Sequence, residues 1–166
     1  MGSSVHEDYI MRQIRAAVRI LLHAIGLREA GDLEAARREL GEVYRELLGS
    51  ETFLFSKMDS KTGADLLSRP EKMAVMADLL HEESEMLRAA KQHDGASLDK
   101  RALEYALEAF MVAPKSNENV SRIKKLAERV PLETLDERYR ELLKDLTPSD
   151  SPLSGGENLY VENRKH

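Results

Sequence analysis

The chain has no cysteine and no tryptophan among its 166 residues, and it contains only three phenylalanines. The absence of cysteine excludes disulfides, thiolate metal ligands and cysteine nucleophiles, and it fits a protein of a reducing compartment. Because large aromatic residues are scarce, a core must be built from Leu, Ala, Met, Ile and Val, a set in which good helix formers predominate. The length and composition favour one domain of ordinary size.

Long apolar runs and an excess of basic charge are also missing. No apolar segment approaches the ~20 residues that are needed to cross a bilayer. The start, Met1-Gly2-Ser3-Ser4, lacks the basic and apolar blocks of a secretion signal. The net charge of −5 argues against general binding of polyanions. We therefore expect a cytoplasmic protein whose partner is neither a membrane nor a nucleic acid.

Residues 10–48 have the pattern of two amphipathic helices that fold back on each other. Apolar residues recur at steps of three and four along the first of them. These residues are Ile10, Ile14, Val18, Leu21, Leu22 and Ile25. Gly31 can adopt the left-handed conformation that ends a helix, and Asp32 can cap the next one. The second helix repeats the spacing with Ala36, Leu40, Val43, Tyr44 and Leu47. The pattern predicts an antiparallel helical hairpin.

The segment 49–69 loses this periodicity and gathers Gly, Ser, Thr and Asp. It also holds Phe53 and Phe55, two of the three phenylalanines. We expect one or two short helical turns here, with both rings tucked into the gap between two hairpins. The alternative is that Phe53 and Phe55 line a ligand pocket or face a partner.

A second hairpin is expected at 70–113. Pro70 can start its first helix, because the missing N–H costs nothing at the first position. This helix should end near 93–95. Ser97 or Asp99 opens the next helix, which ends before Pro114. The methionines of the first helix are most simply core residues, although an adaptable Met-lined groove is the alternative. They are Met73, Met76 and Met86.

Two further helices should follow Pro114. The polar residues 116–119 offer caps for a fifth helix, and Val130-Pro131 ends it and starts a sixth that runs to Leu146. From Thr147 onward the composition turns to Pro, Ser, Gly and Asp, as in a tail. We predict an all-α protein of about six helices, with a single helical domain at 6–146 and a tail at 147–166.

The turn and second helix of the first hairpin resemble a tetratricopeptide repeat. The run from Ala30-Gly31-Asp32 to Ala36, followed by Leu40 and Val43, matches the small and large positions of that repeat. The second hairpin offers Ala102, Ala106, Ala109 and Pro114 at the same offsets. Ala36 and Ala102 lie 66 residues apart, near twice the usual period of about 34. The resemblance implies a repeat-like layer whose inner helices form a concave surface that binds a peptide or another copy of the chain.

Residues 8–113 also resemble a family of small bacterial helical proteins of unknown function. The resemblance rests on Asp8-Tyr9-Ile10-Met11-Arg12 and on the run from Gly26 to Asp32. That family carries no assigned activity, so the resemblance implies relatives but no chemistry.

Catalytic signatures are mostly missing. The Gly155-Gly156 pair is not followed by the Lys-Ser/Thr of a phosphate loop, and no serine lies in a nucleophile elbow. One face of the third helix could carry Asp78, His81 and Glu85, a spacing that metal-binding helical bundles use. The other interpretation is a solvated acidic face, since no second acid-x-x-His pair occurs. We expect no enzyme and no cofactor, with a metal-binding bundle as the alternative.

Arg12, Arg15 and Arg19 recur at steps of three and four and give the first helix a basic ridge. It is either a solvated face paired with acids or a clamp for an acidic peptide or carboxylate, because Arg binds carboxylates through two nitrogens. We therefore predict a non-enzymatic interaction module whose partner-binding residues are the basic ridge with Phe53 and Phe55. A homodimer is expected if a large apolar patch stays exposed.

Overall fold

The computed structural model describes residues 2–92 and 95–147, with side chains from Ser4 onward. Within these residues the protein is all-α, as predicted, with the six expected helices and two short additional ones in the connector. The α-helices are α1 Gly2–Glu29, α2 Leu33–Leu48, α3 Thr52–Lys57, α4 Ser60–Leu67, α5 Pro70–Ala89, α6 Gly95–Val112, α7 Asn117–Ala127 and α8 Glu137–Leu146. Two 3-10 turns, Gly49–Glu51 and Leu132–Thr134, complete the chain path. Of the predicted tail at 147–166, only Thr147 belongs to the described residues.

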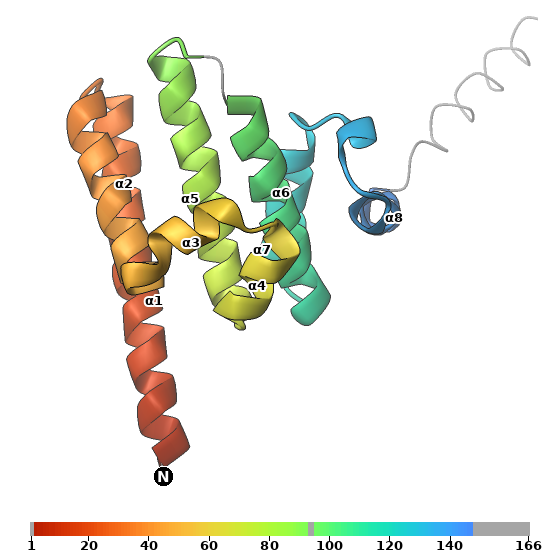
Figure 1. Cartoon of the computed structure of the whole chain (residues 1–166), viewed down its shortest axis with the longest axis horizontal. Coiled ribbons are helices and arrows are strands. Elements are labelled where there is room, and N and C mark those ends of the chain that lie inside the picture. The colour runs from red at the N-terminus through yellow and green to blue at the C-terminus, as the bar shows by residue number, and fades with distance from the viewer. Residues whose placement is uncertain (1, 93–94, 148–166) are drawn as a thin grey trace, which may run out of the picture.

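The predicted first hairpin is present as α1 and α2. Gly31 has φ +88°, and the Asp32 carboxylate accepts a hydrogen bond from the Ala35 N–H at 3.2 Å, so the turn ends one helix and caps the next. The predicted apolar face of α1 is partly wrong, because Val18 and Leu22 are exposed. The reason is position, since α1 and α2 lie at one end of the layer (Figure 1), where α1 packs mainly against α2 and α5. The buried residues of α1 are Ile14, Ala17, Leu21 and Ala24.

The connector forms α3 and α4, which lie across α5 and α6 (Figure 1). Phe55 is buried at 5% exposure, as expected, but Phe53 is 71% exposed. Residues two positions apart on a helix point about 200° apart, so α3 cannot turn both rings toward the hairpins. Gly63 of α4 packs directly on α6. A Cβ at this position would lie 1.9 Å from the Tyr105 hydroxyl oxygen.

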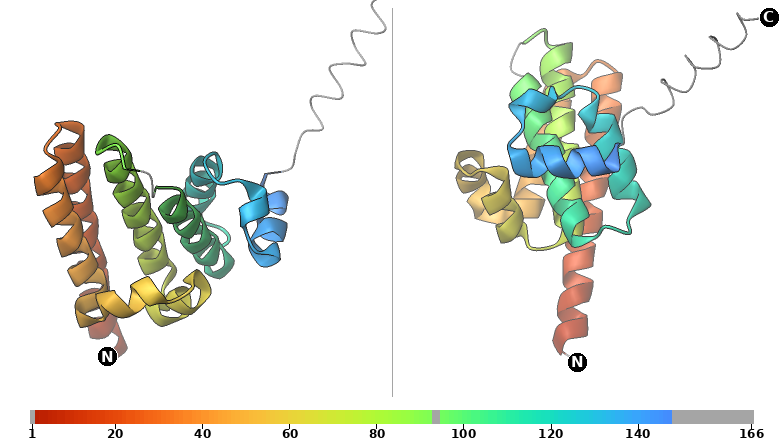
Figure 2. Two further views of the ribbon diagram at one scale, coloured as in Figure 1. Left: turned by 45° about the horizontal axis from the view of Figure 1, so that its top comes forward. Right: turned by 90° about the vertical axis from the view of Figure 1, so that its right-hand side faces the viewer.

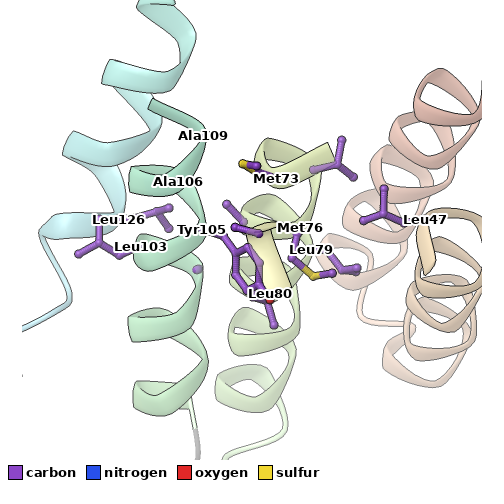
Figure 3. Close-up of a cluster of buried hydrophobic side chains, with 14 of the residues drawn as sticks. Leu47, Met73, Met76, Leu79, Leu80, Leu103, Tyr105, Ala106, Ala109 and Leu126 are labelled. Carbon is purple, nitrogen blue, oxygen red and sulfur yellow. The ribbon is translucent and has the colours of Figure 1, made fainter. Parts of the chain in front are cut away.

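The second hairpin, α5 and α6, is the centre of the layer. Helix α5 contacts α1, α2, α4 and α6, and residues 102–109 of α6 are all buried. Met73, Met76 and Met86 are buried in the core, as the simpler interpretation predicted; Figure 3 shows Met73 and Met76 among their apolar neighbours. The predicted start of α6 at Ser97 or Asp99 is wrong. The helix begins at Gly95, and the buried Asp99 carboxylate pairs instead with the Arg88 guanidinium of α5.

Helices α7 and α8 cover the far end of the layer. The Ser116 hydroxyl caps α7 by accepting from the Asn119 N–H at 3.2 Å, which confirms a cap among residues 116–119. The sixth predicted helix starts later than expected, at Glu137, because Leu135 and Asp136 adopt extended conformations. Figure 2 shows α7 on the opposite side of α5 and α6 from the connector. None of the described helices combines the length and the hydrophobicity that a membrane span requires.

Candidate functional site

Asp78, Glu82 and Glu85 of α5 are ion-paired with arginines from other parts of the fold, so the predicted solvated acidic face is wrong. The Arg28 Nε of α1 donates to both carboxylate oxygens of the buried Glu82 at 2.7 Å. Arg122 of α7 donates to the two oxygens of Asp78 at 2.7 and 3.1 Å. These pairs, which we call the arginine ties of α5, connect it to helices on both sides. Burial of a carboxylate is tolerated when a hydrogen-bonded cation satisfies it in this way.

The metal alternative receives no support from this geometry. Glu85 is held by Arg129, which follows α7, and Asp78 by Arg122, so arginines already occupy both carboxylates. His81 is half-buried, and burial lowers the pKa of its imidazole. Within residues 2–92 and 95–147, no three His, Asp or Glu side chains are grouped in a way that could hold a metal ion. Asp78, His81 and Glu85 share a helix but do not form a ligand set.

The basic ridge of α1 is exposed and has no partner among the residues that the structure describes. The side chains of Arg12, Arg15 and Arg19 form no ion pair or hydrogen bond with the described residues. The interpretation as a face paired with acids is therefore wrong for this part of the chain. Arg12 and Arg19 line a shallow groove of about 630 Å³ between α1 and α2. Arg15 lies on the same side of α1 as Val18 and Leu22, which follow it by three and seven residues.

A second groove, of about 420 Å³, runs between α1, α5 and the start of α7. Its apolar lining includes Val18 of α1 with Ala74 and Val75 of α5. Its polar lining comes from Glu71 and Asp78 of α5 and from α7, where Arg122 donates to the Asn119 side-chain amide oxygen Oδ1 at 2.9 Å. Arg15 and Leu22 flank Val18 on α1, so Val18 connects this groove to the exposed side of that helix.

Phe55 lines a third cavity, of about 240 Å³, between α2, α3, α5 and α6. Phe53 lies outside this cavity, and a ligand- or partner-binding role for the two rings stays a prediction. The Tyr44 hydroxyl donates to the Glu83 carboxylate at 2.5 Å, and burial together with Glu83 raises the pKa of Tyr44. In the same cavity, Arg101 Nη2 of α6 donates to the Phe55 carbonyl oxygen at 3.1 Å.

Sequence reasoning missed two buried carboxylates of α6. Glu104 accepts a hydrogen bond from the Ser60 hydroxyl at 2.8 Å, and Glu108 pairs with Arg138 of α8 at 2.9 Å. Burial raises the pKa of both carboxyl groups. They recur four residues apart inside the otherwise apolar run 102–110, a signal that could have identified them. Both join α6 to a neighbouring helix.

No family model, characterised protein or solved structure matches this chain. The tetratricopeptide and bacterial-family resemblances stay predictions. The candidate surfaces therefore have to be judged on their own chemistry. They comprise the basic ridge with the two grooves beside it, and the cavity under α3.

Proposed function

We propose that this protein is a non-enzymatic interaction module that binds an acidic, partly apolar protein segment along α1. The observation that carries the proposal is the basic ridge. Its three guanidinium groups are exposed beside exposed Val18 and Leu22, and no described residue pairs with them. The arginines of the α5 ties, by contrast, are engaged by carboxylates of a neighbouring helix. A net charge of −5 makes a nucleic acid a poor partner for so small a basic surface.

The apolar residues would supply most of the affinity, and the arginines the selectivity. An exposed ion pair contributes about 0.2–1 kcal/mol. Full burial of a Val or Leu side chain contributes about 1.5–3 kcal/mol. Leu22 is 62% exposed, so a partner that covers it removes much of its apolar surface from water. Opposite charge on the partner then fixes its register and speeds its encounter with α1.

The proposal of a non-enzymatic role rests on how the buried acids are used. Glu82, Glu104 and Glu108 each have a hydrogen-bonding partner on another helix. Each of these carboxylates therefore connects two helices. In every case the helix that carries the carboxylate packs against the helix that carries its hydrogen-bonding partner. We therefore assign them to stability rather than to proton transfer.

A charge-reversal experiment tests the proposal. The probe is a fluorescein-labelled peptide with Glu and Leu at alternating helical turns, followed by fluorescence anisotropy. Arg15→Glu/Arg19→Glu should weaken binding by about tenfold or more, because it sets like charges opposite each other. The matched control is Arg37→Glu/Arg38→Glu, which makes the same charge change at exposed positions of α2 and should leave affinity within about twofold.

Leu22→Ser tests the apolar half of the proposal at an exposed position where folding is not at risk. It should also weaken binding of the same peptide. Equal affinities for the wild type and both α1 variants would refute the proposal, as would an equal loss in the α2 control.

A second candidate, self-association, is favoured by the N-terminal turns of α1, which project beyond the other helices (Figure 1). Val5 and Tyr9 are exposed there one turn apart, and the Glu7–Arg69 ion pair ties this segment to the rest of the protein. A short helix without packing partners is marginal in water. A second copy that packs along it would stabilise it.

Light scattering over a range of protein concentrations tests self-association. The wild type should dimerise, and Val5→Ser/Tyr9→Ser should shift it toward the monomer. Leu54→Ser/Leu66→Ser removes comparable exposed apolar surface from the connector and serves as the control. A wild type that stays monomeric at every concentration would reject this candidate.

A further inference from the structure

The cavity under α3 contains two opposite charges that form no ion pair with each other or with any other described residue. Glu83 enters it from α5, and Arg101 enters it from α6. Glu83 accepts a hydrogen bond from the Tyr44 hydroxyl, and Arg101 donates to the Phe55 carbonyl oxygen, but neither forms an ion pair within the described part of the chain. Both are half-buried. Each therefore keeps hydrogen-bonding capacity for a ligand.

The rest of the cavity is small and largely apolar, with hydroxyl groups from Tyr44, Thr52 and Ser56. Met76 and Leu80 of α5, Leu98 of α6 and Phe55 of α3 provide its apolar lining. Its volume of about 240 Å³ corresponds to roughly eight water molecules at ~30 Å³ each. This is below the usual 300–1,000 Å³ of drug-sized sites. The cavity therefore suits a molecule of few atoms with one apolar branch.

We infer that this cavity binds a free α-amino acid with an apolar side chain. The ammonium group meets the Glu83 carboxylate, the carboxylate meets the Arg101 guanidinium, and the side chain lies against Met76 and Phe55. The inference is independent of the proposed peptide surface, which lies on α1.

A zwitterion fits this cavity better than a simple amine or a simple acid. A ligand with one charge would exclude water from both protein charges but would pair only one of them. A desolvated charge without a partner is costly, so such a ligand would lose much of what its single ion pair gains. A neutral apolar ligand would leave both charges unpaired.

Isothermal titration calorimetry on the full chain tests the inference with L-leucine, L-methionine and L-phenylalanine as probes. Isopentylamine and 4-methylpentanoate present the leucine side chain with only one of the two charged groups. We expect at least one amino acid to bind, and each single-charge analogue of leucine to bind about tenfold more weakly or worse than leucine.

Two conservative variants identify the residues. Glu83→Gln keeps an acceptor for Tyr44, and Arg101→Gln keeps a donor for Phe55, so both should remain folded, as thermal melting would verify. Each should lose about tenfold or more in affinity for the amino acid. Glu46→Gln and Arg37→Gln make the same charge changes outside the cavity and should have no effect.

Three results would overturn the inference. The first is the absence of both binding heat and NMR shifts at Phe55 and Leu98 with millimolar amounts of all three amino acids. The second is an analogue that binds as tightly as leucine, which would make this a site for an amine or an acid. The third is an equal loss of affinity in the control variants.

Discussion

Gly63→Ala is the most direct test of how the connector packs on the layer. In an open helix, this substitution stabilises a protein by about 1 kcal/mol, because alanine loses less backbone entropy than glycine. At Gly63, however, the new Cβ would lie 1.9 Å from the Tyr105 hydroxyl oxygen and 3.0 Å from Cζ. Tyr105 is fully buried and cannot swing into solvent.

The steric cost should exceed the propensity gain. Overpacking of a buried site typically costs about 1–3 kcal/mol, and the loss can be larger when the neighbour is held on all sides. We therefore expect Gly63→Ala to lower the free energy of unfolding in urea by up to about 2 kcal/mol after the helix gain is subtracted. The matched control is Gly41→Ala in α2. A Cβ at this position meets no atom within 4 Å, so the substitution should stabilise the protein.

A double variant locates the cause of the loss. Tyr105→Phe removes the hydroxyl, which is buried and accepts or donates no hydrogen bond within the described part of the chain, and should cost little by itself. Gly63→Ala/Tyr105→Phe should therefore recover part of the lost stability, with the 3.0 Å approach to the ring remaining. If Gly63→Ala stabilises the protein as much as Gly41→Ala, α4 does not pack on Tyr105 as described.

Three further perturbations probe the buried polar groups and the connector. Arg28→Ala would leave Glu82 buried and unpaired and should cost about 3–5 kcal/mol in urea unfolding, whereas Arg28→Met/Glu82→Leu should recover most of it. Burial raises the folded-state pKa of Glu104, so its contribution to stability is present below pH 4.5 and is lost as the pH rises through the folded pKa. Glu104→Gln should therefore match the wild type at acid pH and exceed it at neutral pH, and a parallel pH dependence of the two proteins would contradict this. Phe55→Ala should cost about 3–5 kcal/mol, while Phe53→Ser should stay within about 0.5 kcal/mol; similar losses would mean that both rings are buried.

The helices could be predicted from sequence because local signals define them. The residues that end or begin these helices do so through their own backbone or through a neighbour within three residues. They are Gly31 with Asp32, Pro70 and Ser116. The face of α1 was harder to assign, because Leu21 and Leu22 are both apolar and only their neighbours decide which is buried. Once the ends of the layer are known, the exposure of Leu22 follows.

The pairing of charges could not be predicted, because its partners lie far apart in the chain. Arg28 and Glu82 are separated by 54 residues, and Asp78 and Arg122 by 44. A local pattern of acids on one helix looks the same whether water or arginine solvates it. The basic ridge was predicted as a pattern, but its lack of partners became visible only in the fold.

The arginine ties have a consequence for the register of α5. A seam of Ala, Leu and Met looks similar one turn further along, so apolar packing alone would tolerate a slide of about 5.4 Å. Such a slide would separate the carboxylates of Asp78 and Glu82 from their guanidinium partners at the same time. The ion pairs thus select a single axial position for α5. The relative placement of the residues in every groove or cavity that α5 lines depends on that position.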